Sequence, residues 1–198
     1  ERVPMPSVFN SLSVESNYCN HIGEFKNAYL VSASWSGENV AYASRANYCR
    51  DSLDLFAVSH SELCYEDVTS VKLYQVFFSK NSEGSSNSYF LYDCKGCLNC
   101  FGCVNLRNKQ YYIFNKPFSR EDYFAKLKEF DIGSHGTLER MKRLFADHKF
   151  KALNRYANIV NCKNVTGDNL AQVSDSSYCF DVIDDVRNCK FIMNGGFK

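Results

Sequence analysis

Four cysteines stand three residues apart in one short stretch of the sequence: Cys94, Cys97, Cys100 and Cys103. Thiolates this close together can hold zinc or an iron–sulfur cluster, sense redox state, or form disulfides. Structural zinc sites usually take their two CxxC pairs from separate segments of chain. The bacterial iron–sulfur run has three residues in its last gap and then Pro, whereas two residues fill the last gap here and Val104 follows. The sequence therefore leaves metal binding and redox sensing as alternatives, without favouring them.

The same spacing of three recurs where no metal ligand stands. A ligand cannot be exchanged for valine, but a small hydrophobe can, and free cysteine packs as one. We therefore predict that the four thiols fill a tight interior, with no metal or cofactor. The rows that share this spacing are Cys19, Ile22, Phe25, Ala28 and Val31; Val40, Ala43, Ala46, Cys49, Ser52, Leu55 and Val58; and Val68, Val71, Tyr74 and Phe77.

A spacing of three matches neither an α-helix nor a long strand, whose periods are 3.6 and 2.0. It is typical of a chain that turns at frequent corners around a narrow core. Short runs rich in aromatic and β-branched residues, bounded by Asn, Ser, Asp or Gly, support brief strands. The sequence predicts a mainly β fold, a right-handed parallel β-helix (β-solenoid). The runs are 26–31, 38–43, 52–58, 72–78, 88–92 and 109–114.

A helical hairpin is predicted as an insertion over 119–155. Ser119 and Asp122 form a capping box for a helix that runs to about Phe130. Thr137 is expected to cap a second helix, and His148 is expected at the edge of its apolar face rather than as a ligand. Strand-like runs resume afterwards. The interpretation is a single solenoid domain, 1–198, whose helices cover the side or end of the stack.

Composition limits the partners and the compartment. The 198 residues are 45% hydrophobic and 23% charged with a formal net charge of +1, so neither nucleic acid nor a membrane is expected as a partner. Ten cysteines are too few for a secreted disulfide scaffold, which favours reduced thiols and a cytoplasmic protein. The chain begins at Glu1, and its repeat spacing continues to the end, so we expect a piece of a longer protein. Open solenoid ends make a homodimer possible.

The stretch from Asn87 to Asp122, with its run of four cysteines, resembles an uncharacterised family of uncultivated, reduced-genome bacteria. Segments 61–66 and 166–169 resemble it too, and the likeness covers about 15–193. The resemblance implies a cysteine-rich, β-helix-like body that usually follows an N-terminal zinc-ribbon region, which this chain lacks. Family members tend to carry Cys where this chain has Val68, Val71 and Tyr74. The family brings no established activity, and although some of its sequences are labelled as CoA-transferases, nothing in this sequence supports that chemistry.

Two classes of function besides metal or redox sensing follow from these features. The favoured one is a non-catalytic binding or scaffold module for an unknown protein partner or for the remainder of a longer chain. Trp35 is its candidate anchor, with packing over a coil corner as the alternative. The other is a polysaccharide-active enzyme, by analogy with other β-helices. Its candidate carboxylates are Asp181, Asp184 and Asp185, near Arg187, although a solvated turn is the favoured interpretation of these residues. The sequence disfavours an enzyme overall.

Overall fold

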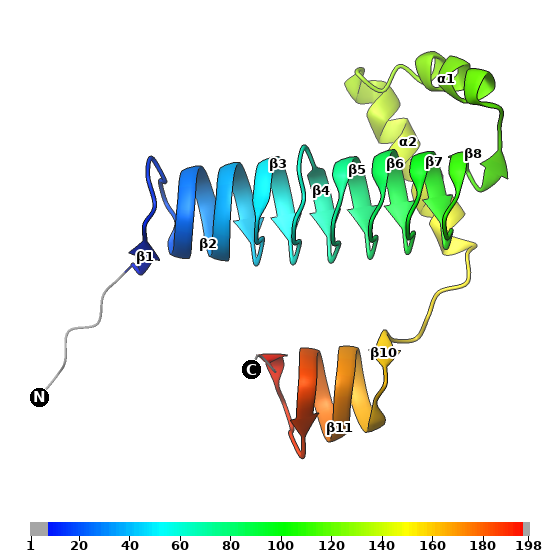
Figure 1. Cartoon of the computed structure of the whole chain (residues 1–198). Helices are drawn as coiled ribbons and strands as arrows, with labels where there is room; N and C mark the ends of the chain where they lie inside the picture. Colours follow the sequence, from blue (N-terminus) through cyan, green and yellow to red (C-terminus); the bar gives the residue numbers. More distant parts are fainter. Residues whose placement is uncertain (1–7, 196–198) are drawn as a thin grey trace, which may run out of the picture. The chain divides into compact units, whose positions relative to one another are not determined.

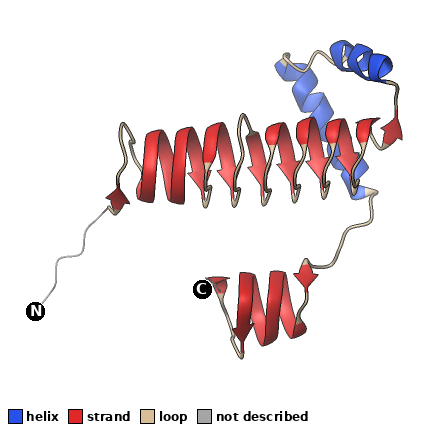
Figure 2. Cartoon of the chain, viewed as in Figure 1, coloured by secondary structure: helices blue, strands red, loops and turns tan. Residues whose placement is uncertain are grey.

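The computed structural model describes residues 8–195, apart from the side chains of Asp184 and Asn194. They belong to two compact units, Glu1–Ala152 and Leu153–Lys198 (Figure 1). Unit 1 contains a nine-stranded sheet and two helices, and unit 2 contains a three-stranded sheet (Figure 2). The predicted mainly β, parallel architecture is confirmed in each unit. The single domain predicted over 1–198 stays a prediction.

The elements follow one another along the chain with no strand skipped in either sheet. Unit 1 comprises β1 (Asn10–Ser11), β2 (Asn20–Ser44), β3 (Cys49–Phe56), β4 (Tyr65–Val68), β5 (Tyr74–Lys80), β6 (Ser86–Tyr92), β7 (Leu98–Val104), β8 (Gln110–Ile113), β9 (Lys116–Pro117), α1 (Arg120–Glu129) and α2 (His135–Phe150). Unit 2 comprises β10 (Ile159–Val160), β11 (Lys163–Arg187) and β12 (Met193–Gly195).

Each coil of unit 1 contains twelve residues. From β1 to β8 the strands pair in parallel, and every partner lies twelve residues ahead, as in Leu53 with Tyr65 and Tyr65 with Phe77. The last pair, β8 with β9, is antiparallel and ends the ladder. A chain whose strands pair in parallel at a constant interval of twelve residues forms a solenoid, in which each coil contacts only its neighbours.

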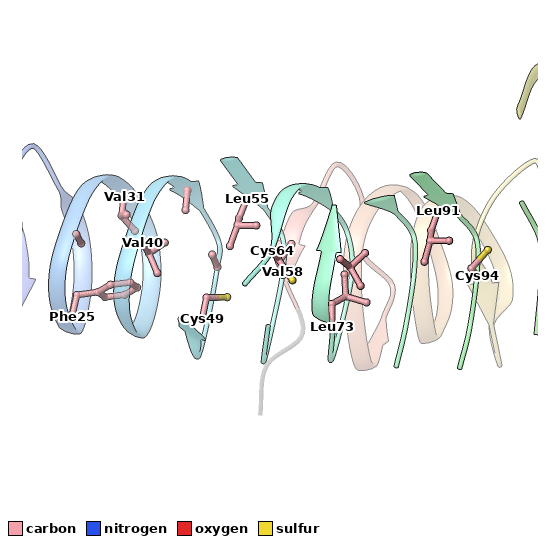
Figure 3. Close-up of a cluster of buried hydrophobic side chains, with 14 of the residues drawn as sticks. Phe25, Val31, Val40, Cys49, Leu55, Val58, Cys64, Leu73, Leu91 and Cys94 are labelled. Atoms are coloured by element: carbon pink, nitrogen blue, oxygen red, sulfur yellow. The ribbon is translucent and has the colours of Figure 1, made fainter. Parts of the chain in front are cut away.

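A sharp corner occurs at every third residue, which explains the spacing seen in the sequence. From Leu12 to Phe114 every third residue has a positive φ, a conformation that costs most side chains energy and that Asn, Asp and Gly adopt readily. The next residue then points into the coil. The predicted rows that begin at Cys19, Val40 and Cys94 are buried, and Figure 3 shows side chains such as Val40, Cys49 and Cys94 inside the coils.

The predicted row Val68, Val71, Tyr74 and Phe77 is wrong, because it is displaced by one residue. Val71 and Tyr74 are exposed, and the interior positions are Asp67, Ser70, Leu73 and Val76. The apolar pattern failed there because three of the interior positions from 67 to 79 are polar. Interior rows therefore follow the positive-φ corners rather than hydrophobicity.

Serine and cysteine share one hydrogen-bonding role inside the coils. The Oγ of Ser88 donates to the carbonyl of Ser86 (2.7 Å) and accepts the N–H of Cys100, one coil later (3.0 Å). The Sγ of Cys19 likewise donates to Asn17 O (3.2 Å) and accepts the N–H of Val31 (3.5 Å). A buried backbone N–H without a hydrogen-bond partner is costly. These side chains therefore accept the N–H groups of residues that directly follow a corner, such as Cys100 and Val31.

The two helices pack against the side of unit 1, as the hairpin prediction requires. Ser119 Oγ accepts the N–H of Asp122 (3.0 Å), so the predicted cap of α1 is confirmed. The second helix begins at His135 after Ser134, two residues before the predicted Thr137 cap. Neither helix in the described part of the chain is long and apolar enough to cross a membrane.

Unit 2 repeats the coil plan less regularly. Its partners lie eleven residues apart between β10 and β11 (Ile159 with Leu170) and thirteen apart between β11 and β12 (Phe180 with Met193). Its core is small, consisting of Leu170, Val173, Cys179 and Val182.

Candidate binding groove

A groove of about 520 Å³ lies between α1 and the neighbouring face of the solenoid. No charged side chain lines it. We call it the aromatic–amide groove. Its lining residues are Leu63, Gln75, Phe77, Asn87, Tyr89 and Asn99 from the coils, and Tyr123, Phe124 and Leu127 from α1.

The aromatic part of the groove follows from the twelve-residue register. Phe77 and Tyr89 are ladder partners on adjacent coils, so their side chains leave the sheet one above the other. Their rings stack at 5.0 Å between centroids with 11° between planes. Phe101 continues the column at 6.1 Å from Tyr89. Phe77 and Tyr89 form an apolar platform on one wall of the groove, whereas Phe101 is fully buried and does not line it.

A row of amides stands beside this platform. Gln75, Asn87 and Asn99 occupy corner positions of successive coils, twelve residues apart, with φ of 52°, 48° and 50°. Within the described chain, their side-chain amides form no hydrogen bond with protein groups. The same column behaves differently nearer the N-terminus, where Asn27 Nδ2 donates to Asn39 Oδ1 (2.9 Å). The groove amides therefore keep both donor and acceptor free.

Tyr123 contributes a further free polar group. Its side chain is fully buried and lines the groove, yet its hydroxyl has no hydrogen-bond partner among the described residues. Burial raises the pKa of this phenol, so the hydroxyl stays protonated and can donate. A buried hydroxyl without a partner costs about 1–3 kcal/mol. The protein therefore keeps an unfavourable group at this wall.

The second helix packs directly against the coils. Phe145 packs on Phe90 (5.7 Å between centroids), and Met141 is buried in the same cluster. Lys142 bonds Glu66 (3.0 Å) and lies over the ring of Phe78 (4.7 Å). Aromatic contacts position α1 itself, because Tyr111 meets Tyr123 (5.7 Å between centroids) and Phe124 (6.1 Å) and so holds the α1 wall of the groove against the coils.

The cysteine quartet lies inside unit 1, away from solvent. Cys94, Cys97, Cys100 and Cys103 are at most 1% exposed, and all ten cysteines of the chain are free. Each of the four thiols donates to the carbonyl two residues before it, as Cys103 does to Phe101 (3.4 Å). The quartet thus bonds as the interior serines do, so it is more than the apolar filler predicted from the sequence.

Burial and the neighbouring thiols set the ionisation of the quartet. The nearby Cys97 thiol, with burial, raises the pKa of Cys94, and the nearby Cys103 and Cys97 thiols, with burial, raise the pKa of Cys100. Cys97 stands between Cys100 and Cys94, and these neighbours lower its pKa. Within the described residues, no three His, Cys, Asp or Glu side chains are arranged to hold a metal ion.

The candidate carboxylates of unit 2 lie along one strand, β11. Asp181 accepts a hydrogen bond from Asn169 Nδ2 (2.9 Å), and Asp185 forms an ion pair with Arg187 (2.8 Å). The side chain of Asp184 lies outside the described residues. Each of the two described carboxylates thus bonds a neighbour on its own strand.

Trp35 lies on the surface of β2, half-exposed. Its ring covers Gly23, where an added Cβ would come within 2.2 Å of the indole. Its backbone N–H donates to Asn47 Oδ1 (2.7 Å), and its ring lines a small cavity of about 170 Å³ together with Phe9 and His21. Both features predicted from the sequence are present: the ring packs over a neighbouring coil and still offers surface.

A second, charged groove of about 750 Å³ lies on another face of unit 1. Lys26 and Arg50 both pair with Glu38, at 3.1 and 3.6 Å, and Tyr48 stacks on His60 at 4.8 Å. These groups already satisfy one another from coil to coil. Exposed ion pairs of this kind contribute little free energy and leave little for a ligand.

The comparisons with known proteins assign no function. No family model and no curated protein matches the chain. One similar solved structure is a provisionally named acetyltransferase from Desulfovibrio desulfuricans G20, with 12% identity and a TM-score of 0.19. The alignment covers 91% of this chain and 55% of that structure, so this chain spans little more than half of its length.

Sequence reasoning missed the residues of the aromatic–amide groove. A period of twelve would have revealed its coil wall, because Phe77, Tyr89 and Phe101 repeat at that interval, as do Gln75, Asn87 and Asn99. The α1 wall had no such signal, since only docking of the helix brings it to the coils.

Proposed function

We propose that the chain is a non-catalytic ligand-binding module built on a right-handed, cysteine- and aromatic-rich β-solenoid, and that it binds through the aromatic–amide groove. One observation carries the proposal: an uncharged aromatic groove is lined by polar groups that have no protein partner. These are the hydroxyl of Tyr123 and the amides of Gln75, Asn87 and Asn99. A ligand site is typically a concave, mostly apolar surface with a few such polar groups.

The chemistry of the groove supports binding rather than catalysis. No carboxylate, histidine, cysteine or lysine lines it, so it offers neither a general acid or base nor a nucleophile at neutral pH. The phenol of Tyr123 has its pKa raised by burial, which makes it a poor base. The groups present can position a ligand by stacking and hydrogen bonding.

Ligand-observed NMR with a library of small, uncharged compounds tests this function. Compounds should bind the intact chain, and Asn87→Ala should weaken them, because Asn87 is exposed and its loss removes a free amide. Asn27→Ala is the matched control, since Asn27 occupies the same column outside the groove. No binder at all, or equal binding to both variants, would contradict the proposal.

A further inference from the structure

We propose that the aromatic–amide groove takes an uncharged oligosaccharide, whose sugar rings lie on the Phe77–Tyr89 platform and whose hydroxyls bond Asn87, Asn99 and Tyr123. This inference rests on the proposed function and names its ligand class. It is carried by the absence of charge, the alternation of flat apolar and amide surface, and the buried free hydroxyl.

The lining excludes charged polymers. A nucleic acid or an anionic glycan needs Lys or Arg against its phosphates, carboxylates or sulfates, and none lines the groove. A strongly basic partner would need acidic residues, which are absent as well. An uncharged ligand pays no desolvation penalty for ions in this groove.

The backbone of the coils excludes an extended peptide added as a strand. Phe77, Tyr89 and Phe101 are already partners in the parallel ladder, so the groove wall offers side chains rather than a free strand edge. Strand addition requires such an edge. A ligand must therefore be recognised through rings and amides.

A sugar matches that pattern of groups. A pyranose ring has a C–H face that packs on an aromatic ring, and its rim of hydroxyls both donates and accepts, as a side-chain amide does. Asn87 and Asn99 offer one amide from each coil beside the platform. The Tyr123 hydroxyl has no partner among the described residues, and because it is buried, a ligand oxygen bonds it only after the Tyr123 side chain shifts toward the groove.

The coil repeat favours a chain of sugars over a single one. Successive coils place Phe77 with Gln75, Tyr89 with Asn87, and then Asn99 along the groove at the strand spacing of about 4.8 Å, so similar contacts recur over these coils, although Phe101 of the third is fully buried. A linear oligomer can occupy several of them at once, which raises affinity without any new kind of contact.

The test measures binding of neutral cellohexaose, mannohexaose and xylohexaose to the intact chain by calorimetry, with an oligogalacturonate as the charged control. We expect at least one neutral hexamer to bind, and Asn87→Ala and Tyr123→Phe each to weaken it about tenfold, the loss of one hydrogen bond or more. Asn27→Ala should leave binding unchanged. Tyr123→Phe should also raise the midpoint of thermal unfolding, because it removes an unpartnered buried hydroxyl.

Four results would overturn the inference. If no neutral hexamer binds but an uncharged non-sugar compound binds and is weakened by Asn87→Ala, the ligand class is wrong and the proposed function stands. If neither kind of compound binds, both fall. If the oligogalacturonate binds as tightly as the neutral hexamers, the groove does not select uncharged ligands. If Tyr123→Phe leaves hexamer binding unchanged, the Tyr123 hydroxyl does not bond the ligand.

Discussion

The backbone N–H of Cys97 donates a 3.2 Å hydrogen bond to the Oγ of Ser85, its counterpart one coil earlier. That Oγ in turn donates to the carbonyl of Glu83 (3.3 Å). A single side-chain atom thus links a corner amide to a carbonyl on the previous coil. Interior Ser and Cys therefore contribute hydrogen bonds to the fold and not volume alone.

Replacing Ser85 with Ala should destabilise unit 1 by about 1–3 kcal/mol, because the N–H of Cys97 then lies buried without an acceptor. Urea unfolding followed by circular dichroism measures the change. Ser86→Ala is the control, since Ser86 is half-buried and its side chain does not face the interior. Equal stability of the two variants would show that the Ser85 bond contributes nothing.

Cys97→Ala should fold and lose about 1–2 kcal/mol, from the shortened side chain and the cavity it leaves. Cys97→Ser should lose less, because its Oγ can take the place of the thiol in the bond to Lys95 O. Elemental analysis of protein purified without chelator accompanies the unfolding curves. Stoichiometric zinc or iron, together with complete unfolding of both variants, would instead make the quartet a metal site.

The thiols should differ sharply in reactivity. Alkylation of the native protein with iodoacetamide, followed by peptide mass spectrometry, should label Cys162 and Cys189, the two partly exposed cysteines. The eight buried cysteines should react only after unfolding. Burial raises the pKa of Cys49 to about 11 and that of Cys64 to about 12, which further lowers their reactivity. Rapid native labelling of Cys97 would support a redox role.

Stability should fall as pH rises from about 4 to 7, because of Asp67. Its Oδ1 accepts the N–H of Ser79 (2.9 Å), its Oδ2 has no partner among the described residues, and burial raises its pKa from 3.8 to about 7. Between these pH values the folded state holds a proton that the unfolded state has lost, so the free energy of unfolding declines as pH increases and then levels off.

Asp67→Asn should remove this pH dependence. At pH 8 the variant should be more stable than the natural chain by up to about 4 kcal/mol, the upper limit set by the pKa shift of Asp67. Exposed Asp51 provides the control substitution, Asp51→Asn. Thermal unfolding between pH 4 and 8 checks both, and an Asp67→Asn curve parallel to that of the natural chain would contradict the assignment.

The sequence predicted the solenoid well where the interior is apolar. Cys19, Val40 and Cys94 begin rows whose spacing of three residues matches the spacing of the corners. The side chains of these rows are buried, which confirms the predicted interior positions. The prediction failed at Val68, since Asp67 and Ser70 look like surface residues until their bonds to backbone and neighbouring serine are seen. Polar interiors are recognisable only by period, not by hydrophobicity.

The candidate binding site was beyond sequence reasoning for a different reason. Ser119 and the apolar face around Met141 predicted two helices correctly, but neither indicates where the pair docks. Tyr123 becomes a functional candidate only because docking buries its hydroxyl beside Tyr89 without giving it a partner. Properties that arise from tertiary contact leave no local pattern in the chain.

The strict twelve-residue register also governs how such a protein can change in length. Removing or duplicating one full circuit keeps every corner, ladder partner and inward side chain in phase. Any other insertion moves all later residues to the wrong corner, and a shift that is not a multiple of three also turns interior side chains outward. Variation in the length of unit 1 is therefore quantised in whole circuits, whereas unit 2, whose partners lie eleven and thirteen residues apart, keeps no such strict register.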